Sequence, residues 1–169
     1  MSSIVLSLLV DNQAGVLSRI SGLFSRRGYN IDSITVGVSE NPSLSRMTLV
    51  SSGEPEVLEQ IQKQLSKLVD VHEVKVLPAD HSVCRELILL KVNCTAEERQ
   101  QVIVVADVFR AKIVDVSPDS VIIELTGAQS KLEAFIHLLD KFSVSALART
   151  GITGLSRGSF GDGFEPYSL

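Results

Sequence analysis

A short polar turn, DNQAG at residues 11–15, has the clearest potential for binding chemistry in this sequence. It lies between an apolar run and an amphipathic helix, so the free N–H groups of the first helical turn point beyond it. A helix N-terminus favours an anion by its charge and by these donors, and a carboxylate suits it. Gly15 lets a ligand approach the backbone, and Asn12 offers both a donor and an acceptor. Polar turns of this kind are also common helix caps, and from spacing alone both interpretations stay open.

Asn30 and Ile31, at the start of the next strand, extend this inventory. They would supply a polar group for an ammonium ion and an apolar wall. Together with the turn, they suit an amino acid with an aliphatic side chain as the ligand.

No other part of the sequence shows a catalytic or metal-binding pattern. The three histidines lie in different predicted elements without neighbours at metal-ligand spacing, and no serine has a nucleophile motif around it. Cys84 and Cys94 match no zinc or redox motif, so we expect buried reduced thiols. The glycine cluster at 158–163 neither follows a strand nor opens a helix, which favours a flexible tail over a phosphate loop. We therefore predict no catalytic residue and no metal site.

Composition narrows the function classes further. The 169 residues are 44% hydrophobic and 21% charged, as in a chain with one core or two small ones. The net charge of -4 and pI near 5.4 argue against a nucleic-acid surface, and the few aromatic residues argue against an RNA-binding sheet. The apolar runs are too short to cross a bilayer, and the N-terminus does not read as a signal peptide. We expect no membrane partner and a cytoplasmic location.

The elements that position the turn follow from hydrophobic periodicity. The first half predicts a strand at 3–10, a helix from Val16 that ends at Gly28, a hairpin of two strands, a helix from Pro55 and a strand at 71–76. This order is βαββαβ.

The second half repeats the order after Pro78. Its predicted strands are 86–93, 112–116, 121–126 and 144–148. Two capping boxes, Thr95 with Glu98 and Ser130 with Glu133, predict the starts of its two helices.

The chain therefore predicts an α+β fold with two ferredoxin-like βαββαβ domains in tandem. We expect a first domain at 1–77, a linker at 78–84, a second domain at 85–150 and a tail at 151–169. Each domain would hold both helices on one face of a four-stranded sheet. The other face needs cover, which predicts dimerisation or domain pairing.

Several longer segments carry a family resemblance. "LLVDNQAGVLSRISGLFSRRGYNIDSITV" resembles the first half of an ACT domain, and "NPSLSRMTLV" and "LEQIQKQLSKLVDV" continue the match in order. With "FRAKIVDVSPDSVIIELTG" and "ARTGITGLSRG", the chain from about residue 3 to 158 resembles the small regulatory subunits of acetolactate synthase (acetohydroxyacid synthase).

This resemblance implies a non-catalytic subunit in branched-chain amino-acid biosynthesis. It implies a homodimer that activates a catalytic large subunit carrying thiamine diphosphate, FAD and magnesium, and that makes this subunit sensitive to valine or a related branched-chain amino acid. The first domain would bind the effector and dimerise, and the second would activate the large subunit. The implied binding residues are Asn12, Gly15, Val16 and Leu17 of one protomer with Asn30 and Ile31 of the other. The alternative is a stand-alone ACT-type amino-acid sensor for a different partner.

Overall fold

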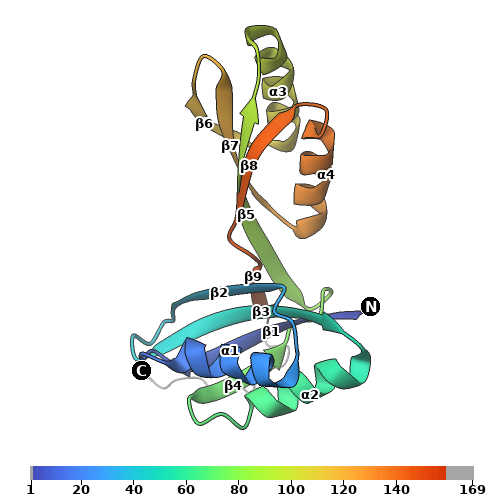
Figure 1. The fold of residues 1–169 in the computed structure, drawn as a ribbon. Helices are drawn as coiled ribbons and strands as arrows, with labels where there is room; N and C mark the ends of the chain where they lie inside the picture. The colour runs from blue at the N-terminus through green and yellow to red at the C-terminus, as the bar shows by residue number, and fades with distance from the viewer. Residues whose placement is uncertain (1, 159–169) are drawn as a thin grey trace. The chain divides into compact units, whose positions relative to one another are not determined.

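The computed structural model describes residues 2–158, which form two compact units (Figure 1). The first unit contains the chain up to Cys84 and the segment that begins at Ile152, and the second runs from Arg85 to Gly151. Each unit is built on a βαββαβ order and an antiparallel sheet. The predicted α+β fold of two ferredoxin-like domains is confirmed.

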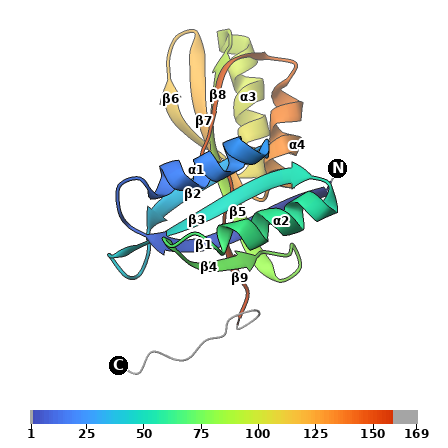
Figure 2. The same ribbon diagram turned by 60° about the horizontal axis from the view of Figure 1, so that its bottom comes forward.

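The first unit has its two helices on one face of its sheet, as Figure 2 shows. The strand order is β2-β3-β1-β4, so β2 and β4 are the edges. Its main elements are β1 (Ser2–Asp11), α1 (Val16–Arg27), β2 (Ser33–Val38), β3 (Leu44–Gly53), α2 (Pro55–Leu65) and β4 (Val71–Val76).

The core of this unit lies between the sheet and these helices. Alternate residues of β1 face it, because successive side chains of a strand point to opposite sides. Leu6, Leu8 and Val10 are fully buried there. The predicted apolar faces of α1 and α2 cover them with Val16, Ile20, Leu23, Phe24, Leu58, Ile61 and Leu65.

Helix α1 ends where the sequence predicts. Gly28 has φ 68°, and its N–H bonds back to the last turn of the helix. This left-handed conformation is one that glycine adopts without the steric cost that a Cβ brings. Arg26 and Arg27 occupy the last turn, where positive charge suits the helix dipole.

The second unit repeats the plan with strand order β6-β7-β5-β8. Its elements are β5 (Ser82–Asn93), α3 (Ala96–Phe109), β6 (Lys112–Val116), β7 (Ser120–Gly127), α4 (Gln129–Leu139) and β8 (Ser143–Arg149). Its core is built from alternate residues of β5 and β7 packed against both helices, with Phe135 as its largest fully buried side chain.

One of the two predicted capping boxes in this unit is wrong. The Thr95 and Glu98 box is present in full at the start of α3. In α4, however, Ala128 is the N-cap and Ser130 lies inside the helix. Because β7 ends at Gly127 and the chain turns directly into α4, Ser130 has helical geometry and cannot serve as the extended N-cap residue.

Residues after Gly151, predicted as a tail, contain a further strand. This strand, β9 (Thr153–Ser156), pairs with β5, which itself begins at Ser82 inside the segment predicted as a linker. A four-residue strand carries too weak a pattern to be predicted, because tertiary contacts rather than periodicity specify it. Residues 159–169, which include most of the glycine cluster, lie outside the described residues.

Candidate functional site

The polar turn at residues 11–15 links the end of β1 to the start of α1. Asn12 ties this turn to the loop between β2 and β3: its N–H donates to the Ser43 carbonyl at 2.8 Å, and its Nδ2 donates to the Pro42 carbonyl at 3.0 Å. The side chain therefore holds the turn in place. Its second amide hydrogen and its Oδ1 are the groups it has left to offer a ligand.

The N-terminus of α1 is open. Gly15 is the N-cap residue with φ 87°, no side chain caps the helix, and the first turn contains no acidic residue. The N–H groups of the first turn have no acceptor within the helix, so an anion is favoured beside them. Val16 points into the core, whereas Leu17 is 48% exposed next to this open end.

Arg19 adds positive charge at the same end of α1. Its Nε and Nη2 contact the carboxylate of Asp70 at 2.5 and 2.9 Å, and the Asp70 side chain is only 11% exposed. The remaining Nη1 lies close to Gly15, because a Cβ built on that glycine would be 3.5 Å from it. Arg19 was not among the binding residues predicted from the sequence. Its position one turn after Gly15 could have indicated a positive charge near the turn, but nothing in the sequence indicated its partner Asp70, 51 residues away.

Asn30 and Ile31 lie beyond the other end of α1. The Asn30 Nδ2 contacts Asp32 Oδ1 at 2.5 Å, its carbonyl accepts from Ser51 Oγ at 2.6 Å, and Ile31 is partly buried against the core. The 12 residues of α1 span about 18 Å at 1.5 Å per residue. Within one chain, the structure therefore brings Asn12, Gly15, Val16 and Leu17 together and leaves Asn30 and Ile31 apart from them.

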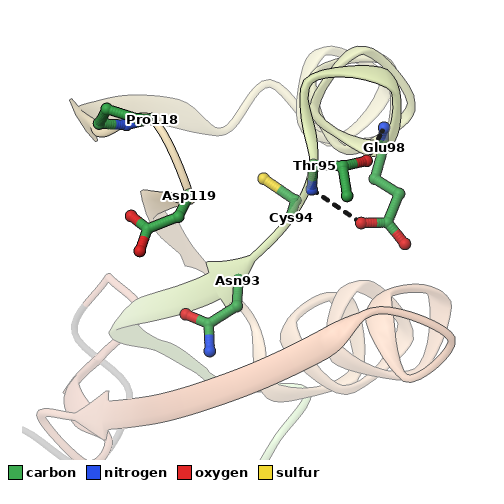
Figure 3. Close-up of a pocket in the computed structure, with 6 residues that line it drawn as sticks. All are labelled: Asn93, Cys94, Thr95, Glu98, Pro118 and Asp119. Atoms are coloured by element: carbon green, nitrogen blue, oxygen red, sulfur yellow. Dashed lines mark hydrogen bonds between the residues drawn. The ribbon is translucent and has the colours of Figure 1, made fainter.

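In the second unit, the corresponding place is the start of α3, and there side chains of the protein cap the helix. A pocket of about 390 Å³ lies there, lined by Asn93, Cys94, Thr95, Glu98, Pro118 and Asp119 (Figure 3). The Glu98 carboxylate accepts from the Thr95 N–H at 2.8 Å, and Thr95 Oγ1 accepts from the Glu98 N–H at 3.2 Å. The protein's own side chains thus occupy the helix start, and Asp119 adds a second carboxylate that disfavours an anion.

Each histidine lies beside an aspartate: His81 beside Asp80, His137 beside Asp140, and His72 beside Asp11, the first residue of the polar turn. Neither cysteine forms a disulfide within the described residues; Cys94 is buried, and Cys84 is partly buried. Among residues 2–158, no three His, Cys, Asp or Glu residues are placed to hold a metal ion. No helix in the same range is long and apolar enough to cross a bilayer.

Family models match both units. A family described as "AHAS small subunit-like ACT domain" matches residues 6–73, and one described as "Small subunit of acetolactate synthase" matches residues 85–158. A "Probable acetolactate synthase small subunit" of Methanothermobacter thermautotrophicus is 50% identical over 156 residues, 92% of this chain and 93% of the relative. The chain belongs to the acetolactate synthase small-subunit family.

Two other members of this family support the same assignment. The acetolactate synthase isozyme 3 small subunit of Salmonella typhimurium is 46% identical over 155 residues, 91% of this chain and 95% of that protein. The crystal structure of the acetolactate synthase small subunit from Thermotoga maritima superposes with a TM-score of 0.86 at 44% identity. It covers 94% of this chain and 99% of the other, so the family likeness includes both units.

Proposed function

We propose that this chain is the regulatory subunit of an acetolactate synthase, which activates a catalytic large subunit and makes it sensitive to valine. Relatives at 46–50% identity over nearly their whole length are named small subunits of this enzyme. The family match at residues 85–158 favours this function over a stand-alone amino-acid sensor, because a simple sensor needs no such second domain. The catalytic cofactors, thiamine diphosphate, FAD and magnesium, would belong to the large subunit.

The open N-terminus of α1 carries the effector part of this proposal. An amino-acid carboxylate would accept from the N–H groups after Gly15, and Arg19 would add a favourable charge. The start of α3, where the same place is filled by Glu98, offers no such position. We therefore place one effector site in the first unit and none in the second.

The other half of the effector site would come from a second protomer. Asn12, three residues before Gly15, is hydrogen-bonded to the β2–β3 loop that follows the end of β2, and Asn30 lies just before the start of β2. When two copies of an edge strand pair about a two-fold axis, they run antiparallel, so the start of each lies beside the end of the other. This pairing would bring Asn30 and Ile31 of one protomer to the turn of its partner, twice in each dimer.

The edge itself supports this dimer. Val36 and Val38 of β2 are 48% and 65% exposed. An exposed edge with apolar side chains is a template for pairing with another chain. In the dimer, Ile31 and the exposed Leu17 would form an apolar wall for an aliphatic side chain, and the Asn30 side chain would face the ammonium group.

Reconstitution tests the function. The purified chain is mixed with the large subunit from the same source, and acetolactate formation from pyruvate is measured with and without valine. We expect the chain alone to form no acetolactate, the mixture to exceed the large subunit alone, and valine to inhibit only the mixture. Acetolactate formation by the chain alone would refute the non-catalytic role. Equal activity of the mixture with and without valine would refute the effector role.

A further inference from the structure

The segment 152–157, here called the clasp, lies on the face of the first unit's sheet that carries no helices. Its first residue is bound through both backbone groups. The Ile152 N–H donates to Ser33 Oγ at 3.0 Å, and the Ile152 carbonyl accepts from Thr35 Oγ1 at 3.0 Å. Both hydroxyls belong to β2 and point to the same side, because they are two residues apart. The clasp is therefore attached to the strand that follows Asn30 and Ile31.

The rest of the clasp is closely packed. The Gly154 N–H donates to Oγ1 of Thr48, which is only 2% exposed. A Cβ on Gly154 would lie 2.7 Å from the Cys84 Sγ and 2.9 Å from the Leu77 side chain, so only glycine fits without a shift of its neighbours. Further along, the Arg157 Nε donates to the Ser82 carbonyl at 3.0 Å. These contacts fix the clasp along its length.

The clasp is also continuous with the second unit. Gly151, with φ 84°, is the last residue of that unit and directly precedes Ile152. The adjacent Thr150 N–H donates to the Leu87 carbonyl at 3.0 Å, so the chain is held on both sides of this glycine. The second unit is thus joined to the first by two covalent connections, before Arg85 and after Gly151. A movement of Ile152 must be taken up at Gly151.

The residues just before β2 are also held within the first unit. The Asn30 carbonyl accepts from Ser51 Oγ, and Ile31 packs against the core. Only Asp32 separates Ile31 from Ser33. A ligand that repositions Asn30 and Ile31 would therefore shift, through Asp32, the start of the strand whose hydroxyls hold Ile152.

We propose that the clasp couples effector binding to the second unit, with Ser33 and Thr35 as positioning residues; this proposal rests on the effector site described above. Coupling requires an element with two arrangements that both sites bias. Here the arrangements are a clasp held by both hydroxyls and a clasp released to water. Exchanging two hydrogen bonds for water is a small enough change in free energy for a ligand to reverse.

The test separates valine binding from valine inhibition in the full-length chain. Thr35→Val removes the hydroxyl at nearly constant shape, Ser33→Ala removes the other one, and Thr35→Ser restores a donor. Ser52→Ala, on β3 opposite Ser3, is the matched control outside the clasp. Calorimetry gives the Kd of valine for each chain alone, and reconstitution gives the activity without valine and the concentration that inhibits by half.

We expect all four variants to bind valine and to activate the large subunit within about twofold of the parent. Thr35→Val and Ser33→Ala should raise the inhibitory concentration at least about fivefold, the lower end of typical allosteric coupling. Thr35→Ser and Ser52→Ala should behave like the parent. If the two hydroxyls had only a structural role, their removal would lower stability and activation and would not separate valine binding from valine inhibition.

Other outcomes overturn the proposal. If both hydroxyl-deleted variants are folded and inhibited like the parent, the clasp does not transmit the signal, and the effector site stands without it. If either variant loses valine binding itself, the hydroxyls belong to the binding site. If the parent chain binds no valine, the effector proposal fails, and this coupling fails with it.

Discussion

Replacing Gly15 with aspartate puts a carboxylate at the start of α1, where we propose that the effector's own carboxylate binds. The substitution changes more than charge. Gly15 has φ 87°, a conformation that costs a residue with a Cβ about 1 kcal/mol or more. Aspartate at an N-cap also accepts from the N–H groups of the first turn and so competes for the same donors.

A series of three variants separates these effects. Gly15→Ala tests backbone strain alone, since its Cβ would be 3.5 Å from the Arg19 Nη1, an ordinary contact. Gly15→Asn adds a neutral cap, and asparagine tolerates this conformation better than most residues. Gly15→Asp then adds only the charge. The step from asparagine to aspartate isolates the electrostatic repulsion of the ligand.

The size of that step follows from Coulomb's law. Two unit charges about 5 Å apart repel by about 3 kcal/mol at an effective dielectric constant of about 20. Arg19 lies close enough to neutralise part of the new charge. We therefore expect a net loss of about 2 kcal/mol, or about 30-fold in affinity, for aspartate relative to asparagine. Alanine should change the affinity by less than about threefold, and asparagine by about fivefold through competition for the N–H donors.

Calorimetry with valine measures these affinities, and thermal melting shows whether each variant is folded. Activation of the large subunit should persist in all three. If folded aspartate and asparagine variants bind valine equally, charge does not act at this turn. If the aspartate variant binds like the parent, the turn is only a helix start and the effector binds elsewhere.

Three further predictions concern assembly and stability. Val38→Lys on the edge strand β2 should weaken the dimer at least about tenfold in sedimentation, because the charge opposes pairing of two such edges; an unchanged dimer would place the interface elsewhere. Two shortened chains test the clasp: one ends at Pro78, and in the other a short Gly-Ser linker replaces residues 85–151. The first should melt at a lower temperature, because only the second keeps the clasp over Leu77 and Thr48. Equal melting temperatures would show that the clasp adds no stability. Arg149→Ala should lower the free energy of unfolding by about 3 kcal/mol in urea titration, because the Glu86 carboxylate, 6% exposed, loses its bidentate partner. The hydrogen bonds that Arg149 donates to Glu86 and then to Glu133 raise the pKa of Arg149, so this loss should be the same at pH 6 and pH 9. A loss below about 1 kcal/mol would mean that water replaces the guanidinium.

Local pattern was sufficient for most of the fold. The apolar spacing in α1 and the alternation in β1 each reflect burial on one side, and burial is what sets the period of a helix or a strand. The Thr95 and Glu98 box marked the start of α3 because both of its hydrogen bonds are made within four residues. The same pattern at Ser130 failed, since the end of β7 rather than the box decided where α4 begins.

The sequence by itself determined a polar turn with glycine before α1, because this feature consists of neighbours in the chain. Tertiary structure alone decided what surrounds it. Arg19 acquires its charge partner from 51 residues away, and Ser33 and Thr35 hold a backbone 119 and 117 residues away. Contacts between distant segments carry no periodic signal, because they depend on how finished elements pack and not on the spacing of residues along the chain.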